Sequence, residues 1–435
     1  MTIVYEFIKW IAVNILGEPF ILVGLIVLLG LLLQNKSLNI LASGTIKAMI
    51  GFLIIGAGTG IIVGSLLVFQ PMWQEVFDLP SQNLGTFLGQ DAFINKYGSA
   101  VTLSMALGFL INVLLAKFTK FKYIYLTGHM MFWTTVIFAG VMVNTTPDIA
   151  VWKLVLVLSI FMGIYWTVQP ALVQPFLRKI LDGDSIALGH TSASVAILGA
   201  IFGKLLGNKE KDSENIKLPE KLEFLRDSNV VTACTMGLLF LVGAVILSFK
   251  HTEGAEKLMA LSGNVNFYVY AVKQSFIFAG GIAVLLLGVR MFIVEIVPAF
   301  NGIAERLVYG ARPALDCPVV YPYAPNAVIL GFLGSFAGAI FWLLVLGKIA
   351  GYVFVPTMIA LFFHSATAGV FGNSTGGIRG ALIAGFITAT IVAVGQYIMV
   401  TFLISNTIPD TAMWAADSDM LLLAPIIKLI TKLIS

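Results

Sequence analysis

The sequence predicts an all-α polytopic membrane protein built from two inverted repeats, and three observations lead to this prediction. First, 59% of the 435 residues are hydrophobic and only 11% are charged, whereas soluble domains carry roughly a quarter charged residues. Second, the mean hydropathy is +0.96. One soluble core could not hide so much apolar surface, so lipid is the natural solvent. Third, similar motifs recur in the two halves of the chain.

Eleven segments approach the length of about 20 apolar residues that a spanning helix needs. They are residues 19–34, 44–70, 99–117, 123–143, 151–173, 229–249, 267–298, 328–347, 351–371, 381–404 and 419–433. Three further segments, 78–98, 184–206 and 309–327, are too polar or too interrupted for simple spans. We expect these three to form re-entrant hairpins or irregular segments, although the middle one could be a twelfth span.

Basic residues in the short loops predict the orientation of the chain. Lys117, Lys120 and Lys122 mark the cytoplasmic side, whereas loops 71–95 and 144–150 contain no Lys or Arg. The N-terminus is then outside and the C-terminus is cytoplasmic. The net charge of +4 is small and spread over loops, so it does not point to nucleic acid as a partner.

The polar stretch NKEKDSENIKLPEKLEFLRDS, residues 208–228, divides the chain near its middle. We therefore expect a first membrane repeat over 1–207, a cytoplasmic linker over 208–228 and a second membrane repeat over 229–435. His129 in YLTGHMMFW corresponds to His364 in ALFFHSATAG. An odd number of spans separates the corresponding elements, so the repeats are inverted, which is typical of transporters that bind substrate near the bilayer midplane.

The proline-rich stretch ARPALDCPVVYPYAPNAVILGF, residues 311–332, lies in nearly apolar surroundings. Its prolines remove backbone donors and exclude a regular helix, and irregular backbone at membrane depth survives only where protein or a water-filled cavity satisfies it. Asp316 would cost about 2.5–3.5 kcal/mol at a bilayer centre. We interpret the stretch as a hairpin that presents Asp316 to sugar hydroxyls; the alternative is a cytoplasmic loop with a solvated carboxylate.

The histidines are the other candidate binding groups. His129 lies inside a predicted span, His190 opens a Ser/Thr-rich interrupted segment, and His364 is followed by Ser365. Each could instead be a packed histidine that makes one hydrogen bond, but ionisable groups within a membrane are usually functional. The histidines lack the local spacing of a metal site, and neither a catalytic set nor a cofactor-binding motif is visible. We therefore expect no metal, no cofactor and no enzymatic activity.

A ladder of small residues, Gly56, Gly60 and Gly64, occurs in the second predicted span. Small residues at this spacing let helices approach closely. The ladder could serve internal packing or a homodimer contact, and the sequence leaves both open.

Six motifs along the chain together resemble a known family of membrane proteins. They are GTIKAMIGFLI, YLTGHMMF, ALGH, GVRMFIVEIVPAFNGIAERLVYGA, LDCPVVYPYAPNAVILGF and FFHSATAGVFGNSTGGIRGAL, in that order. This series resembles the ascorbate-type enzyme IIC permeases of the bacterial phosphoenolpyruvate-dependent phosphotransferase system. The resemblance covers most of the chain, and its most distinctive motifs lie in the second half.

The resemblance implies a multi-pass homodimer in the bacterial inner membrane, in which a core domain moves against a V-shaped dimerisation domain in an elevator-like motion. It implies that sugar is delivered to a separate IIB protein, which phosphorylates it with phosphate that arrives through IIA. Matched by motif, the substrate-binding residues it implies are His129, Trp133, His190, Thr191, Asp316, Tyr321, Thr86, Phe87, His364 and Ser365.

The sequence departs from the ascorbate-type pattern at three of these positions. Trp133 and Thr191 each replace a glutamine, and the FFHS stretch that contains His364 replaces FFSN. Loss of two amide partners changes hydrogen bonding and shape together, and a site built for hydroxyls discriminates strongly against the wrong analogue. Ascorbate, another sugar, a sugar acid and a polyol are all candidate substrates.

Two further functions remain open from the sequence. An ion-coupled secondary sugar transporter could use Asp316 or a histidine to carry protons, and uptake without IIB would support it. A membrane sensor or scaffold would show no uptake in reconstituted vesicles.

Overall fold

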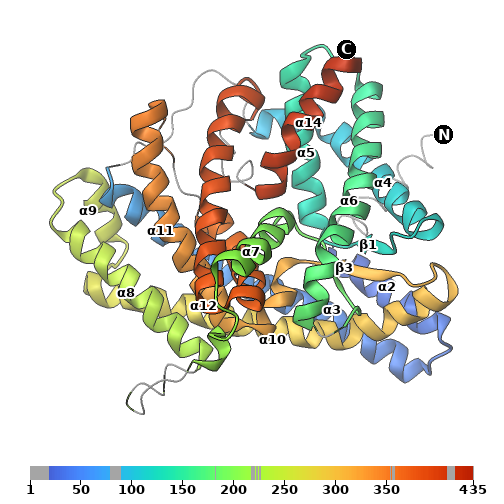
Figure 1. The fold of residues 1–435 in the computed structure, drawn as a ribbon, viewed down its shortest axis with the longest axis horizontal. Helices are drawn as coiled ribbons and strands as arrows, with labels where there is room; N and C mark the ends of the chain where they lie inside the picture. Colours follow the sequence, from blue (N-terminus) through green and yellow to red (C-terminus); the bar gives the residue numbers. More distant parts are fainter. Residues whose placement is uncertain are drawn as a thin grey trace.

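A computed structural model describes residues 19–78, 90–181, 183–216, 227–352, 358–408 and 417–434, together with residues 221, 224 and 354. Helices dominate these residues (Figure 1). In chain order the helices are α2 (Pro19–Leu33), α3 (Leu38–Val76), α4 (Gln90–Phe118), α5 (Gly128–Thr145), α6 (Val151–Leu181), α7 (Ala193–Leu206), α8 (Ser228–Ser248), α9 (Glu253–Ala260), α10 (Phe267–Arg306), α11 (Pro325–Ala350), α12 (Met358–Ile398) and α14 (Ser418–Ile434). Short helical turns occupy η2 (Ser213–Asn215), η4 (Cys317–Tyr323) and η5 (Met399–Leu403).

Six helices among the described residues are long and apolar enough to cross a membrane, judged by length and composition. They are Leu38–Val76, Lys96–Phe118, Val151–Leu181, Phe267–Ile303, Pro325–Ala350 and Ala360–Leu403. Shorter apolar helices cover Val23–Leu33, Ala193–Leu206 and Thr232–Ser248. Many large apolar side chains on these helices are exposed, as expected of a surface that faces lipid. The chain is a predominantly helical, multi-pass membrane protein.

Three predicted spans differ in detail from the observed helices. Segment 123–143 begins as a strand, and α5 starts only at Gly128. Segments 351–371 and 381–404 fall largely in α12, whose path is broken at Gly377 with φ 59° and ψ −154°. A Cβ at Gly377 would lie 2.3 Å from the carbonyl oxygen of Lys211, and the amide of Ile378 donates to that oxygen at 2.8 Å. The break therefore lets the segment after α7 bond to the backbone of α12.

The helical class is confirmed, and the structure adds a small parallel sheet that the sequence did not predict. Strands β1 (Tyr123–Tyr125), β2 (Ala187–Leu188) and β3 (Arg312–Leu315) pair in the order β1-β3-β2. The prolines of segment 309–327 predicted a re-entrant or irregular segment, and the structure has a strand followed by a 3₁₀ turn. Proline has no backbone N–H to donate to a neighbouring strand. Pro313 lies opposite Ile124 of β1 only, because it precedes the two residues of β3 that pair with β2.

Amide side chains cover both edges of this sheet. On the β1 edge, Asn112 of α4 donates to the carbonyl of Tyr123 at 3.0 Å and accepts from the amide of Tyr125 at 3.0 Å. On the β2 edge, Gln174 and Gln169 of α6 donate to the carbonyls of Ile186 and Leu188. Because unpaired strand edges are costly away from water, these side chains make a short sheet possible inside a membrane protein.

The apolar interior forms two large clusters. The first is built mainly from α2, α3, α8, α10, α11 and α12. The second is built mainly from α4, α5, α6 and α14, and it includes Tyr123 and Tyr125 of β1. In Figure 1, α3 and α10 run across the lower part of the molecule, whereas α4, α5, α6 and α14 gather near the C-terminus. The sheet lies where the two clusters meet.

Helices α3 and α10 pack antiparallel through glycines. A Cβ at Gly58 would lie 2.4 Å from the amide nitrogen of Leu285, and one at Gly288 would lie 2.6 Å from that of Ile55. The ladder Gly56, Gly60 and Gly64 takes no part in this contact, since a Cβ at each would meet nothing within 4 Å. The ladder does not serve helix packing among the described residues.

The described part of the polar linker is tied to the second half of the chain. Glu214 accepts backbone hydrogen bonds from Asn326 at 3.1 Å and from Ala327 at 3.1 Å, at the N-terminus of α11. The amide of Ser213 donates to Asn373 of α12. Burial raises the pKa of the Glu214 carboxyl, while its hydrogen bonds act in the opposite direction. This half-buried carboxylate at a helix N-terminus fixes the linker against α11.

Substitution Gly288→Ala should destabilise the protein, because its methyl group collides with α3 backbone. Overpacking of this kind costs typically about 1–3 kcal/mol. Gly280→Ala is the matched control on the same helix, where a Cβ meets nothing within 4 Å. The free energy of unfolding of the purified variants checks this, and equal stability of the two would contradict the packing.

Substitution Asn112→Leu should destabilise the protein by leaving two backbone groups of β1 without partners, at about 1–3 kcal/mol for each buried group. Thr167→Val is the control, since Thr167 accepts from Asn112 but bonds neither strand residue. A smaller loss of unfolding free energy in Thr167→Val is expected. An Asn112→Leu protein as stable as the wild type would show that β1 needs no edge partner.

Candidate functional site

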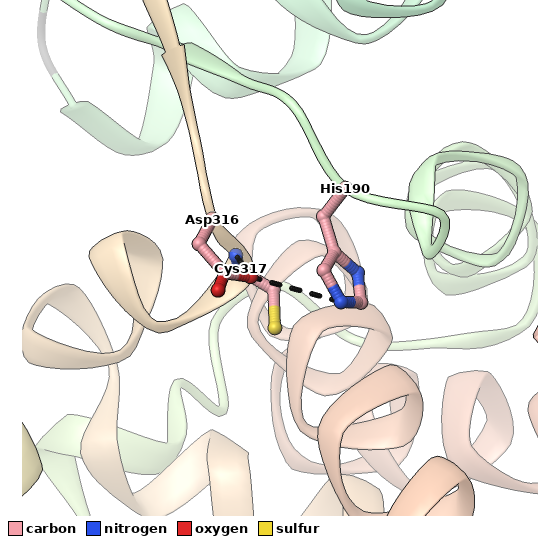
Figure 2. Close-up of side chains that lie close together, drawn as sticks. All are labelled: His190, Asp316 and Cys317. Atoms are coloured by element: carbon pink, nitrogen blue, oxygen red, sulfur yellow. Dashed lines mark hydrogen bonds and ion pairs between the residues drawn. The ribbon is translucent and has the colours of Figure 1, made fainter. Parts of the chain in front are cut away.

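Three candidate binding residues follow the three strands of the sheet. His129 lies in the first turn of α5 after β1, His190 follows β2, and Asp316 follows β3. Since the strands are parallel, their carboxyl ends meet at one edge. The sheet therefore brings together residues that are far apart in the sequence. Figure 2 shows His190 and Asp316 side by side at this edge.

Asp316 lies between the two imidazoles. Its carboxylate oxygens are 3.6 Å from Nε2 of His129 and 3.7 Å from Nε2 of His190. Its Oδ1 also accepts the amide proton of Cys317 at 2.7 Å, which caps η4 and fixes the carboxylate. The imidazole distances exceed ordinary hydrogen-bond lengths. The Asp316 carboxylate and the two imidazoles can therefore still form hydrogen bonds with hydroxyl groups of a ligand.

The surroundings of His190 set its proton position. Its Nδ1 accepts the backbone amide proton of Ser192 at 3.1 Å. In the neutral ring the proton is then on Nε2, so His190 presents a donor towards Asp316. A donor beside an acceptor is suited to a substrate hydroxyl, which can both accept and donate.

His190, Asp316 and Cys317 are also a possible metal-binding group, because their ligand atoms lie within 4.8 Å of one another (Figure 2). A metal needs the Nε2 lone pair of His190. That lone pair is available in the tautomer in which Nδ1 gives up the hydrogen bond from the Ser192 amide and donates instead to the Ser192 hydroxyl, 2.9 Å away. The tautomer that keeps the amide bond fits hydroxyl recognition.

A second polar cluster lies beside the first. His364 Nε2 lies 3.1 Å from Oδ1 of Asp417, and Thr191 Oγ1 donates to Oδ2 of Asp417 at 2.8 Å. The His364 and His190 rings meet edge to face, with centroids 5.2 Å apart. Ser418 connects the cluster, since its hydroxyl donates to the carbonyl of Thr191 at 2.9 Å and lies 3.1 Å from His364 Nδ1.

Both clusters open onto one cavity of about 350 Å³, a volume within the range of small-molecule sites. One wall is polar and carries His129, His190, Asp316, His364 and Asp417. The opposite wall is mainly apolar and comes from α2, α3 and α10, with Val23, Phe52, Ile55, Val63, Val289 and Phe292. Such a cavity suits a small ligand with several hydroxyl groups and an apolar face.

The other predicted binding residues lie around this cavity. Thr191 supports Asp417, and the Tyr321 hydroxyl donates to the Phe363 carbonyl at 2.9 Å, which ties η4 to α12. Ser365 bonds Ser335 of α11, and Trp133 packs edge to face against Phe132. Among the described residues, none of these four lines the cavity itself.

Thr86 and Phe87 lie outside the described residues. Conversely, sequence reasoning missed Asp417, Cys317 and Thr127, which line the cavity. Asp417 had a signal: it stands with Asp419 immediately before the last apolar segment, and ionisable residues at membrane depth are usually functional.

Comparison with known proteins identifies the family of the chain. Residues 14–421 match the family described as PTS system sugar-specific permease component, EIIC-GAT. The chain is 27% identical over 420 residues to the ascorbate-specific PTS system EIIC component of Mycoplasma pneumoniae, a match that covers 85% of this chain and 63% of that protein. The chain thus spans less than two thirds of this relative's length. The resemblance to ascorbate-type IIC permeases is confirmed, and the chain belongs to the family of sugar-specific permease components of the phosphotransferase system.

Proposed function

We propose that this chain is the membrane subunit of a phosphotransferase system that binds ascorbate or a related sugar, sugar acid or polyol and moves it into the cell. The observation that carries the proposal is the convergence of His129, His190 and Asp316 at one edge of the sheet, in a cavity enclosed by membrane-length helices. Donors and acceptors that alternate in this way match hydroxyl groups.

The asymmetry of the cavity supports an elevator-like movement. The polar wall would hold the sugar on a moving core, while the apolar wall from α3 and α10 offers few hydrogen bonds that would need to break during sliding. Helix α3 lies in the first proposed repeat and α10 in the second, and their antiparallel packing supports inverted repeats over 1–207 and 229–435.

We further propose a homodimer in the bacterial inner membrane with the N-terminus outside and the C-terminus in the cytoplasm. Gly56 of the glycine ladder lines the cavity, whereas Gly60 and Gly64 are exposed and available to such a dimer contact. Phosphoryl transfer belongs to the partner IIB with its IIA donor, so this subunit transports but does not catalyse. Phosphorylation by IIB would trap the sugar and drive its uptake.

Reconstituted vesicles should take up the substrate only when IIA, IIB and phosphoenolpyruvate are supplied on the cytoplasmic side. The panel contains radiolabelled ascorbate, pentoses, hexoses, polyols and sugar acids, and the product inside should be a sugar phosphate. Uptake without IIB that collapses with the ion gradient would instead establish the ion-coupled transporter. If no substrate is taken up either with IIB or with an ion gradient, the protein would instead be a membrane sensor or scaffold.

Substitution Asp316→Asn should weaken substrate binding by about 10- to 100-fold, the loss expected for a charged hydrogen-bond partner. Asparagine still accepts the Cys317 amide proton, so the unfolding temperature should not change. The control is Asp184→Asn, which alters a carboxylate that pairs with Arg178 and Arg312 away from the cavity. Unchanged affinity in Asp316→Asn, measured by calorimetry, would refute the role of Asp316.

A further inference from the structure

The cavity contains a second carboxylate whose surroundings narrow the class of substrate. We propose that Asp417 is a second hydroxyl-binding carboxylate, and that the two carboxylates select a neutral sugar or sugar alcohol over an anionic substrate. The inference rests on the proposed sugar-transport function and goes beyond it by choosing among the candidate substrates.

The protein contacts of Asp417 fix its carboxylate and leave it able to accept hydrogen bonds from a ligand. It is buried yet lines the cavity, and among the described residues its side-chain partners are His364 on Oδ1 and Thr191 on Oδ2. A carboxylate offers about four lone-pair sites, so capacity remains on both oxygens. The cavity side of this carboxylate can therefore accept protons from substrate hydroxyls.

His364 and Thr191 act as positioning residues for Asp417. A proton must lie between His364 Nε2 and Asp417 Oδ1, because two facing lone pairs 3.1 Å apart would repel each other. Ser418 fixes the far side of the ring. The position where the sequence departs from the glutamine of the ascorbate pattern, Thr191, thus supports a carboxylate that faces the ligand.

The charges around the cavity disfavour an anion. Among the described residues that line it, the carboxylates are Asp316 and Asp417, and there is no Lys or Arg. Each lining imidazole lies 3.1–3.7 Å from one of these carboxylates. Three imidazoles face two carboxylates, and one protonated imidazole beside each carboxylate balances the charges. An anionic substrate would therefore find an unmatched cation only if both rings beside Asp316 were protonated. Burying an unpaired charge is costly.

A neutral polyhydroxylated molecule fits the same groups without this cost. Its hydroxyls can donate to the carboxylates and accept from His190, while its apolar face packs on the aromatic wall. That wall includes Phe52 and Phe292. Every group in the cavity then has a complementary partner on the ligand.

The test measures binding of matched neutral and anionic probes to the purified full-length chain by isothermal titration calorimetry at pH 7.5, a value chosen so that the acids are ionised. The pairs are galactitol with galactonate and xylitol with xylonate, and ascorbate is the additional anion. The wild type should bind the neutral member of a pair at least about tenfold more tightly.

Asp417→Asn should reduce this affinity ratio by about tenfold, because removing the charge weakens the neutral ligand and relieves repulsion of the anion. Thr191→Val, which keeps the carboxylate and removes one positioning bond, should reduce the ratio less. A purely structural role for Asp417 would lower both affinities and leave the ratio unchanged.

Asp419→Asn is the matched control. Asp419 is buried two residues from Asp417 and is bonded to Tyr165 and Ser194, but it is not among the described residues that line the cavity. The Asp419→Asn variant should have the same ratio of neutral-probe to anionic-probe affinity as the wild type. If Asp417→Asn also keeps the wild-type ratio, or if the wild type prefers ascorbate or the other acids, the inference is wrong while sugar transport stands. If no probe binds and no IIB-dependent uptake is found, both fail.

Discussion

Backbone groups that leave a helix inside a membrane protein must find hydrogen-bond partners within the protein, because lipid offers none. The three short strands satisfy this requirement with one another, and the side chains of Asn112, Gln169 and Gln174 complete both edges. The cavity depends on this arrangement, since the parallel strands place His129, His190 and Asp316 at a common edge. Helices alone could not end so many chain segments at one point without leaving backbone donors and acceptors unpaired.

The same arrangement explains the electrostatics of the cavity. Asp316 lies between His129 and His190, and Asp417 is paired with His364, so each of the two carboxylates that line the cavity has at least one imidazole partner. Buried charge without such a partner would be costly. The contacts to Asp316 are longer than hydrogen bonds, which leaves these groups available to a ligand, whereas the His364 contact is tight and holds Asp417 in place.

The apolar wall has a separate origin. Helices α3 and α10 meet through glycines that bring their backbones into contact, and they contribute Phe52, Ile55, Val289 and Phe292 to the cavity. Close antiparallel packing makes this wall a firm surface of low polarity. A ligand held by hydrogen bonds on one side and by apolar contact on the other can leave the apolar side at little cost, which is the physical basis of the proposed movement.

The sequence by itself determined the solvent, the helical class and the family, and it predicted a role for His129, His190 and Asp316, because apolar length and rare ionisable residues are local properties that composition and motifs reveal. The tertiary structure decided the rest. Strand pairing between residues near 124, 187 and 314 is a long-range event with no local periodicity, so the sheet and its amide-covered edges were missed. The same reason hid Asp417: its role arises from contacts with Thr191 and His364, far away in the chain, that only folding creates.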